Sequence, residues 1–269
     1  MRIDKALLAR RFGRAAPGYD RRARVQERAA DSVVRALAGR WAPGRPPRIL
    51  DLGSGTGLLT ARLLDAWPGA DALGVDLSSG MVDEARRRLA PRGARFAVGD
   101  VEAGLPEGAF ELVASSMALQ WVAAPGAVLR CAGARLAPGG VLAVAVPVEG
   151  TLTELRGAYA GAARALDVAD WRHPGLDFHP AARWEAWARA AFDEVRVEVE
   201  AVVERHPRAR AVLESIRGVG ANDCAGGAGP AAVRLLRHAL ALYDAGSAGP
   251  EGVPATWRLC VLVASRPRR

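Results

Sequence analysis

The sequence is poor in several residue types, and each shortage excludes a class of protein. Lys5 is the only lysine among its 37 basic residues, so arginine carries nearly all the positive charge. Its three cysteines, Cys131, Cys224 and Cys260, are far apart and lack histidines at ligand spacing, which indicates neither a zinc site nor a disulfide framework. We therefore expect no metal, and a reducing cytoplasm as the location.

Long apolar runs and hydrolase motifs are missing as well. No stretch of 18 or more residues is uncharged and apolar throughout, and the first residues lack the apolar core of a signal peptide, so no membrane association is expected. No Gly-x-Ser-x-Gly nucleophile elbow is present. The net charge is +8, but the arginines are scattered and aromatic residues make up only 6%, which favours an acidic protein partner over nucleic acid.

What the sequence does contain is a repeated alternation of short apolar segments and amphipathic helical segments. At 269 residues and 50% hydrophobic content, it can bury one large α/β core. Such alternation predicts a doubly wound, mostly parallel sheet. The expected strands end near Asp51, Asp76 and Val98, then cover 110–114, 141–148, 192–203 and 256–264.

Residues 49–57, Ile-Leu-Asp-Leu-Gly-Ser-Gly-Thr-Gly, are the most informative stretch. Two aliphatic residues bring a buried strand to Asp51, and Gly53, Gly55 and Gly57 then allow a tight turn and close approach of a ligand. A helix with apolar residues at helical spacing follows at once. The glycine spacing differs from the dinucleotide fingerprint, whose third glycine comes one position later, so an NAD fold is not expected.

Three consecutive strands lead into an acidic residue, Asp51, Asp76 or Asp100, at the sheet edge where such folds bind ligands. The combination resembles the signature of class I S-adenosylmethionine-dependent methyltransferases. That resemblance implies that the loop holds the methionine moiety, Asp76 the ribose diol and Asp100 the adenine amino group. The cofactor-binding residues it implies are Asp51, Gly53, Ser54, Gly55, Gly57, Asp76, Leu77, Asp100, Val101 and Ser115.

Segments outside the cofactor motifs carry a closer resemblance, over essentially the whole chain. They are Phe12-Gly-Arg-Ala-Ala-x-x-Tyr19-Asp20, Leu119-Gln120-Trp121, Gly150-Thr151-Leu152-x-Glu154-Leu155, Ser215-Ile-Arg217-Gly218-Val-Gly220-Ala-Asn222 and Thr256-Trp257-Arg258. Together they are similar to the malonyl-acyl-carrier-protein O-methyltransferase family of biotin synthesis. The resemblance implies that the free carboxylate of a malonyl thioester, carried by acyl carrier protein or coenzyme A, is methylated with S-adenosylmethionine.

The chemistry of that reaction suggests roles for particular residues. A carboxylate is already ionised at neutral pH, so no general base is needed, and alignment and exclusion of water should dominate catalysis. We expect Arg217 and Tyr19 to hold the carboxylate, because an arginine fork and a phenol suit its two oxygens. Gln120, Trp121 and Trp257 would wall the pocket, with Trp121 over the sulfonium. The acidic carrier would meet arginines from this set: Arg21, Arg24, Arg28, Arg35, Arg210, Arg234 and Arg237.

The expected organisation is a single methyltransferase domain, residues 1–269, with a seven-stranded sheet whose last strand is antiparallel. Its parts are N-terminal helices (1–44), a cofactor-binding core (45–148), helical lid segments (150–191 and 205–245) and a closing strand pair (192–203 and 255–265). Two other hypotheses stay open. One is a methyltransferase acting on another small carboxylate or a quinone-type carbon, and the other is a non-catalytic interaction protein that keeps the cofactor fold.

Overall fold

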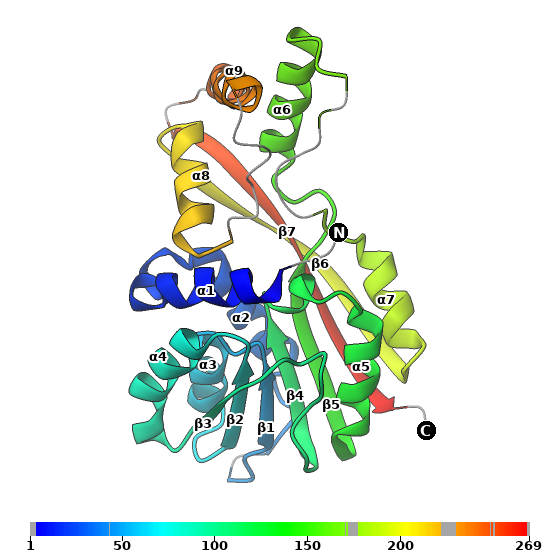
Figure 1. Ribbon diagram of the computed structural model, residues 1–269. Coiled ribbons are helices and arrows are strands. Elements are labelled where there is room, and N and C mark those ends of the chain that lie inside the picture. The colour runs from blue at the N-terminus through cyan, green and yellow to red at the C-terminus, as the bar shows by residue number, and fades with distance from the viewer. Residues whose placement is uncertain are drawn as a thin grey trace.

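A seven-stranded sheet forms the centre of the computed structural model (Figure 1), in the order β3-β2-β1-β4-β5-β7-β6. The structure describes residues 4–42, 44–169, 171, 177–221, 230–247, 249 and 251–267. The strands are β1 Arg48–Leu52, β2 Asp71–Asp76, β3 Arg95–Val98, β4 Phe110–Ser116, β5 Leu136–Pro147, β6 Phe192–His206 and β7 Val253–Pro267.

Strand direction confirms the predicted fold class. The first five strands are parallel, whereas β7 runs antiparallel to both of its neighbours, β5 and β6. Strand β1 pairs with β2 on one side and with β4 on the other. Chain order therefore reverses between β1 and β4, and open α/β sheets bind ligands at the carboxyl ends of strands beside such a reversal.

Helices cover both faces of the sheet, as expected for a doubly wound fold. One face carries α2 (Arg24–Ala36), α3 (Leu58–Ala66) and α4 (Ser79–Leu89), and the other carries α5 (Pro125–Ala134) and α7 (Ala181–Arg189). Each face buries its own apolar cluster, and Trp184 of α7 is 1% exposed within the second. The sheet is therefore a fixed platform whose strand ends are held in place from both sides.

The remaining helices lie beyond the carboxyl edge of the sheet. Helix α1 (Lys5–Ala15) crosses this edge, and α6 (Thr153–Ala165), α8 (Ala209–Gly218) and α9 (Pro230–Ser247) stand above it. Strands β6 and β7 extend beyond this edge toward these helices. This extension follows from the pairing, because β7 pairs with β6 from Val253 onward but with β5 only from Leu259. Of the helices in the predicted lid ranges, α7 lies on the sheet and the other three form this upper group.

The N-terminal helices differ from the prediction in one respect. Asp4 caps α1 as expected, its side chain accepting a hydrogen bond from the Leu7 N–H. The apolar spacing of Val25, Ala29 and Val33 predicts a single helix from about Asp20 to Arg40, and this prediction is wrong, because short 3₁₀ turns at Ala16–Gly18 and Asp20–Arg22 precede α2. Ala23 is fully buried and adopts φ −89°, ψ 41°, which breaks the helix there, and α2 ends at Ala36.

Other differences are small. Further 3₁₀ turns are Ala90–Arg92 and Leu119–Trp121. The sequence Pro138-Gly139-Gly140 predicts a turn, but these residues lie inside the span of β5, next to an irregular register between β4 and β5. The glycines of residues 218–229 predict a loop, most of which lies outside the described residues. In the part of the chain that is described, no helix is long and apolar enough to cross a membrane.

Candidate active site

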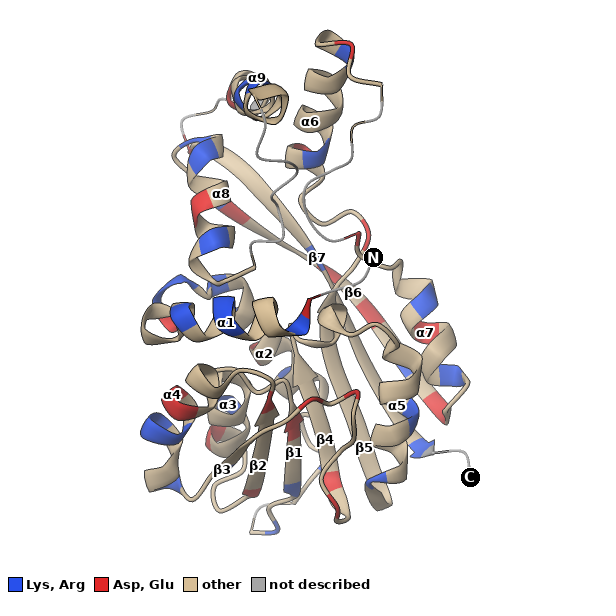
Figure 2. Ribbon diagram, viewed as in Figure 1, with Lys and Arg blue, Asp and Glu red and all other residues tan. Residues whose placement is uncertain are grey.

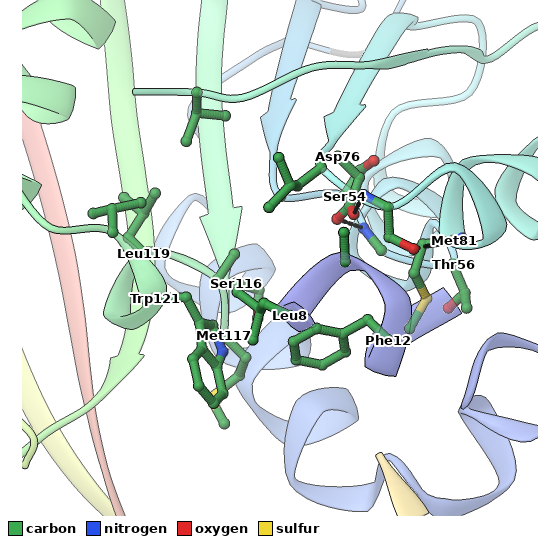
Figure 3. A pocket seen from close by; sticks show the side chains of 18 of the residues that line it. Leu8, Phe12, Ser54, Thr56, Asp76, Met81, Ser116, Met117, Leu119 and Trp121 are labelled. Atoms are coloured by element: carbon green, nitrogen blue, oxygen red, sulfur yellow. Dashed lines mark hydrogen bonds between the residues drawn. The ribbon is translucent and has the colours of Figure 1, made fainter. Parts of the chain in front are cut away.

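A cavity opens at the carboxyl ends of β1 to β4, between the sheet edge and α1 (Figure 3). Its empty volume, the open mouth included, is about 990 Å³. Polar atoms of Ser54 and Asp76 lie on one side, and Leu8, Phe12 and Trp121 lie on the other. The cavity therefore offers polar contacts along the sheet edge and an apolar cover opposite.

The glycine loop forms the floor of the cavity. Gly53, Gly55 and Gly57 have φ of +68°, +54° and +81°, the left-handed region that side chains other than glycine adopt at a cost. The N–H groups of Gly53 and Ser54 both donate to the Val75 carbonyl, at 2.8 and 3.0 Å. A Cβ on Gly53 would lie 2.2 Å from the Ala118 Cβ, so the loop can meet the end of β4 only as glycine.

Asp51 lies beneath this loop rather than in the cavity lining. It is 1% exposed, and its Oδ2 accepts a hydrogen bond of 2.6 Å from the Thr60 hydroxyl. Among the described residues, its Oδ1 has no hydrogen-bond partner. Burial raises the pKa of Asp51 to about 7, the Thr60 hydrogen bond opposes the rise, and the nearby charge of Asp76 adds to it. Asp51 is thus a buried acceptor that a cationic group above the loop would complete.

Asp76 lines the cavity and is held by two backbone donors. Its Oδ1 accepts from the Ser78 N–H at 2.8 Å and its Oδ2 from the Gly55 N–H at 2.9 Å. Burial raises its pKa, and those two hydrogen bonds oppose the rise. Tyr19 also lines the cavity, and burial of its phenol beside Asp76 and Asp20 raises its pKa. Two hydrogen bonds therefore fix Asp76 against the backbone, and Tyr19 lies at the same cavity.

Asp100 marks the third strand end, and Lys5 contacts it. The Lys5 Nζ lies 2.6 Å from Asp100 Oδ2, and Asp100 Oδ1 accepts from the Glu102 N–H at 2.9 Å. Burial favours a raised pKa for Asp100, but the hydrogen bonds from Lys5 and Glu102 outweigh it and lower the pKa. Asp100 is therefore an ionised acceptor at this end of the cavity. Leu77 and Val101, beside the two acids, line the cavity as well.

Helix α1 supplies a wall that the sequence analysis did not identify. Lys5, Leu8, Ala9 and Phe12 all line the cavity, and the Phe12 ring meets that of Trp121 edge to face at 5.7 Å. The spacing of Leu8 and Phe12 places both on one side of a helix, but the same spacing fits ordinary core packing. The unusual signal was Lys5, a single lysine in a chain that otherwise uses arginine.

The other predicted residues lie at varied distances from the cavity. Ser115 is fully buried and donates to the Leu52 carbonyl at 2.7 Å, which ties β4 to β1, while its neighbour Ser116 lines the cavity. Gly57 lies at the start of α3, outside the lining. Gln120 is outside it too, its Nε2 donating to the Met117 carbonyl at 2.8 Å.

Neither Arg217 nor Trp257 lines the cavity. Arg217 is exposed near the end of α8. That end lies against α1, because a Cβ on Gly220 would be 3.2 Å from the Phe12 Cα. Trp257 is 8% exposed on β7, and its indole N–H has no partner among the described residues. The structure thus brings Tyr19 and Trp121 to the cavity and leaves these two in the part of the fold above it.

The residues present fit S-adenosylmethionine. The Oδ1 of Asp51 and the hydroxyls of Ser54 and Ser116 are buried and have no hydrogen-bond partner in the described part of the chain, so polar ligand groups would satisfy them. A Cβ on Gly55 would meet no protein atom within 4 Å, which leaves open space over the loop. Two further acceptors, Asp76 and Asp100, suit hydroxyl and amino donors. Strand order, loop and cavity together define an S-adenosylmethionine-dependent methyltransferase.

Comparison with known proteins gives the same class and narrows it. A methyltransferase domain family matches residues 49–140. The chain is 34% identical to the malonyl-acyl-carrier-protein O-methyltransferase of Geobacter sulfurreducens, over 98% of this chain and 100% of that protein. It is 33% identical to the Laribacter hongkongensis protein of the same name, over 84% of this chain and 77% of the other. The chain belongs to the malonyl-acyl-carrier-protein O-methyltransferase family.

Solved structures share the fold. The YcgJ protein of Bacillus subtilis matches with a TM-score of 0.58 and 15% identity, over 89% of this chain and 99% of that chain. A methyltransferase from Thermotoga maritima matches with a TM-score of 0.54 and 17% identity, over 97% and 99%. At these identities the likeness extends to the fold alone.

Proposed function

We propose that the chain transfers a methyl group from S-adenosylmethionine to the free carboxylate of a malonyl thioester carried by acyl carrier protein, in the reducing cytoplasm. The observation that carries the proposal is the similarity to enzymes of that name over nearly the full length. It includes β6, β7 and the upper helices, which lie outside the matched methyltransferase domain. Those are the parts of the fold that would select a substrate.

The cavity supports a carboxylate as the methyl acceptor. No histidine is among the described residues that line it, and its carboxylates are held by backbone donors or by Lys5. A reaction that removes a proton from carbon needs a positioned base, whereas a malonyl carboxylate is ionised at neutral pH and needs none. This difference favours the carboxylate over a quinone-type carbon.

The protein's contribution is alignment and exclusion of water. The cofactor, when bound, supplies an electrophilic methyl group on a sulfonium. Asp51, the loop, Asp76 and Asp100 would hold its amine, ribose and adenine, while Phe12 and Trp121 cover the cavity from outside. A closed apolar wall keeps water from competing with the carboxylate and strengthens the electrostatic contacts inside.

We propose that Tyr19 and Arg217 bind the malonyl carboxylate. Tyr19 is already at the cavity, and its raised pKa keeps the phenol a hydrogen-bond donor. Arg217 lies in the last turn of α8, whose end packs on α1. A shift of α8 toward the cavity would bring its guanidinium to the substrate. Gln120 and Trp257 would then line the substrate side, where each has a buried polar atom that none of the described residues pairs with.

Exposed arginines around α1 and α2 suit an acidic carrier protein. Arg14, Arg21 and Arg24 are exposed and have no acidic partner among the described residues, and Figure 2 shows basic residues on α1 and α8 along the same side of the molecule. Arg35, by contrast, pairs with Glu200 at 2.8 Å. Unpaired positive charge beside the cavity would attract an acidic partner and raise its association rate.

The direct test is incubation with labelled S-adenosylmethionine and malonyl-carrier protein, followed by mass analysis. We expect the mass of the carrier-bound group to rise by one methylene unit. We also expect the group to lose the negative charge of its carboxylate, because the product is a methyl ester. Malonyl-coenzyme A and a set of small carboxylates serve as competing acceptors. Faster methyl transfer to one of the small carboxylates than to either malonyl thioester would contradict the proposal.

Substitution of Arg217 tests the substrate assignment. Arg217→Ala should raise the KM for the malonyl thioester about tenfold or more, because a charge-assisted pair is lost, and leave the affinity for S-adenosylhomocysteine unchanged. Arg130→Ala, on the exposed side of α5, is the matched control and should change neither. Equal losses of substrate and cofactor affinity in Arg217→Ala would refute the role.

A further inference from the structure

We infer that Lys5 is a positioning residue for the cofactor, because its ammonium group joins α1 to Asp100 and Glu102 and holds α1 over the cavity. The inference rests on the cofactor part of the proposed function and is independent of the methyl acceptor. It assigns a task to the one basic side chain that lines the cavity among the described residues.

The contacts of Lys5 are short and shared between two carboxylates. Its Nζ lies 2.6 Å from Asp100 Oδ2 and 2.6 Å from Glu102 Oε2. The three side chains are 35%, 28% and 14% exposed, respectively, so the group is partly shielded from water. Ion pairs of this kind are stronger than fully exposed ones, because water screens them less.

Glu102 extends the connection to a third wall of the cavity. Its Oε1 accepts from the N–H groups of Ala123 and Ala124, each at 2.9 Å, just after the Trp121 turn and just before α5. Lys5 therefore links α1 to the segment after β3, and Glu102 links that segment to the Trp121 turn. The three walls around the Asp100 end of the cavity are held by one network.

The other contacts described for helix α1 involve its second half, at Phe12 and Gly13. None of its residues is buried, because the cavity lies beneath Leu8, Ala9 and Phe12. Near its far end the backbone of Gly13 packs on α4, where a Cβ on Gly80 would lie 2.9 Å from the Gly13 Cα. Lys5 is at the first turn, so it is the polar tie at the opposite end. Without it, the first half of α1 would be free to lift from the cavity.

The chemistry of the side chain fits this position. Elsewhere the chain uses arginine for every basic residue, 36 in all if Lys5 is subtracted from the 37. A compact ammonium group can donate to two converging carboxylates, whereas a guanidinium is planar and donates along fixed directions. Asp100 Oδ2 keeps a further lone pair when it accepts from Lys5, so it can still receive an amino group of a ligand.

The test compares variants by calorimetry with S-adenosylhomocysteine. Lys5→Met keeps the alkyl chain and should weaken binding about tenfold, mainly through faster release. Lys5→Arg should bind with intermediate affinity, because it restores the charge but not the shape. Arg62→Met breaks the Arg62–Asp31 pair away from the cavity and is the control, with unchanged binding.

Hydrogen exchange gives a readout that does not depend on activity. In Lys5→Met without ligand, the amides of residues 8–12 should exchange faster, while those of α4 keep their protection. A double-mutant cycle with Glu102→Gln should be non-additive, because both substitutions break the same contact.

Two results would overturn the inference. One is a Lys5→Met variant with unchanged S-adenosylhomocysteine affinity, and the other is tighter binding, which would mean that Lys5 competes with the ligand for Asp100. Failure of the unaltered protein to methylate a malonyl thioester would refute only the substrate assignment, since binding of S-adenosylhomocysteine is measured separately.

Discussion

Among single residues, Asp51 should give the apoprotein an unusual pH dependence. Its pKa is raised to about 7 in the folded chain, chiefly by burial, so the folded state holds the proton more tightly than the unfolded state. The associated stability is complete below the unfolded pKa and is lost as pH rises toward 7. Between pH 5 and 7 this group alone should cost about 2 kcal/mol of unfolding free energy.

Urea unfolding of the apoprotein across this pH range measures the effect. Asp51→Asn should flatten the dependence, because the amide does not titrate. It should also weaken the binding of S-adenosylhomocysteine, since a hydrogen-bond acceptor for the ligand's amine is lost. Parallel pH profiles for the two proteins would show that Asp51 does not titrate in this range.

Alanine substitutions at Gly55 and Gly139 can distinguish the loss of stability caused by backbone strain from the loss of ligand affinity caused by filling the cavity. Gly55→Ala places a side chain at φ +54°, which costs about 1–2 kcal/mol of stability, and puts a methyl group beside the ligand space. Gly139→Ala, at φ +77° with no neighbour within 4 Å, should lose similar stability. Only Gly55→Ala should lose S-adenosylhomocysteine affinity, by tenfold or more in calorimetry. Equal affinities in the two variants would place the ligand elsewhere.

Residues of the sheet edge could be predicted from the sequence, and residues that cover it could not. The strands that lead to Asp76 and Asp100 are short apolar runs, so the position of each acid follows from parallel pairing. Lys5 reaches Asp100 across 95 positions in the chain, and no local pattern encodes such a contact. Tyr19 was found through resemblance, since a tyrosine in a turn has no distinctive spacing.

At the scale of elements, α1 is the helix on which the cavity depends, and Gly80 sets how closely it packs. Gly80→Ala would place a Cβ 2.9 Å from the Gly13 Cα, so α1 must shift away. We expect S-adenosylhomocysteine binding to weaken about threefold to tenfold, while the unfolding free energy changes little, because alanine favours the helix by about 0.5–1 kcal/mol.

Gly157→Ala in α6 is the matched control. No atom lies within 4 Å of its added Cβ, so it should gain the helical stability and leave binding unchanged. Calorimetry and thermal unfolding of both variants give the comparison. Unchanged binding in Gly80→Ala would show that the position of α1 has no influence on the cofactor.

Elements inside the sheet followed from the sequence more closely than those outside it. All seven strands were expected, because apolar runs bounded by turn residues are a strong signal. The break at Ala23 was missed, since alanine favours helices and only tertiary packing buries it there. For the same reason, α7 could not be separated from the upper helices, because an amphipathic pattern does not say which surface it meets.

For the whole molecule, the distribution of charge predicts a salt-sensitive encounter with the carrier. The double variant Arg14→Glu, Arg21→Glu should raise the KM for malonyl-carrier protein about tenfold at low salt, and this difference should shrink at high salt. The KM for malonyl-pantetheine, which has no protein carrier, should stay nearly the same. Arg130→Glu on α5 changes the net charge less and lies on another face.

Steady-state kinetics at two ionic strengths provides the measurement. A rise in KM for both acceptors would place these arginines in the catalytic cavity, and no rise for either would place the carrier on another surface.

Lys5 carries the single ε-amino group of the chain, so one side chain can be labelled selectively. Reductive methylation with isotopically labelled formaldehyde would add one side-chain signal in magnetic resonance spectra, apart from that of the terminal amine. That signal would come from the rim of the cavity, next to Asp100. Movement of α1 over the cavity could then be followed from the methyl groups added to this one side chain.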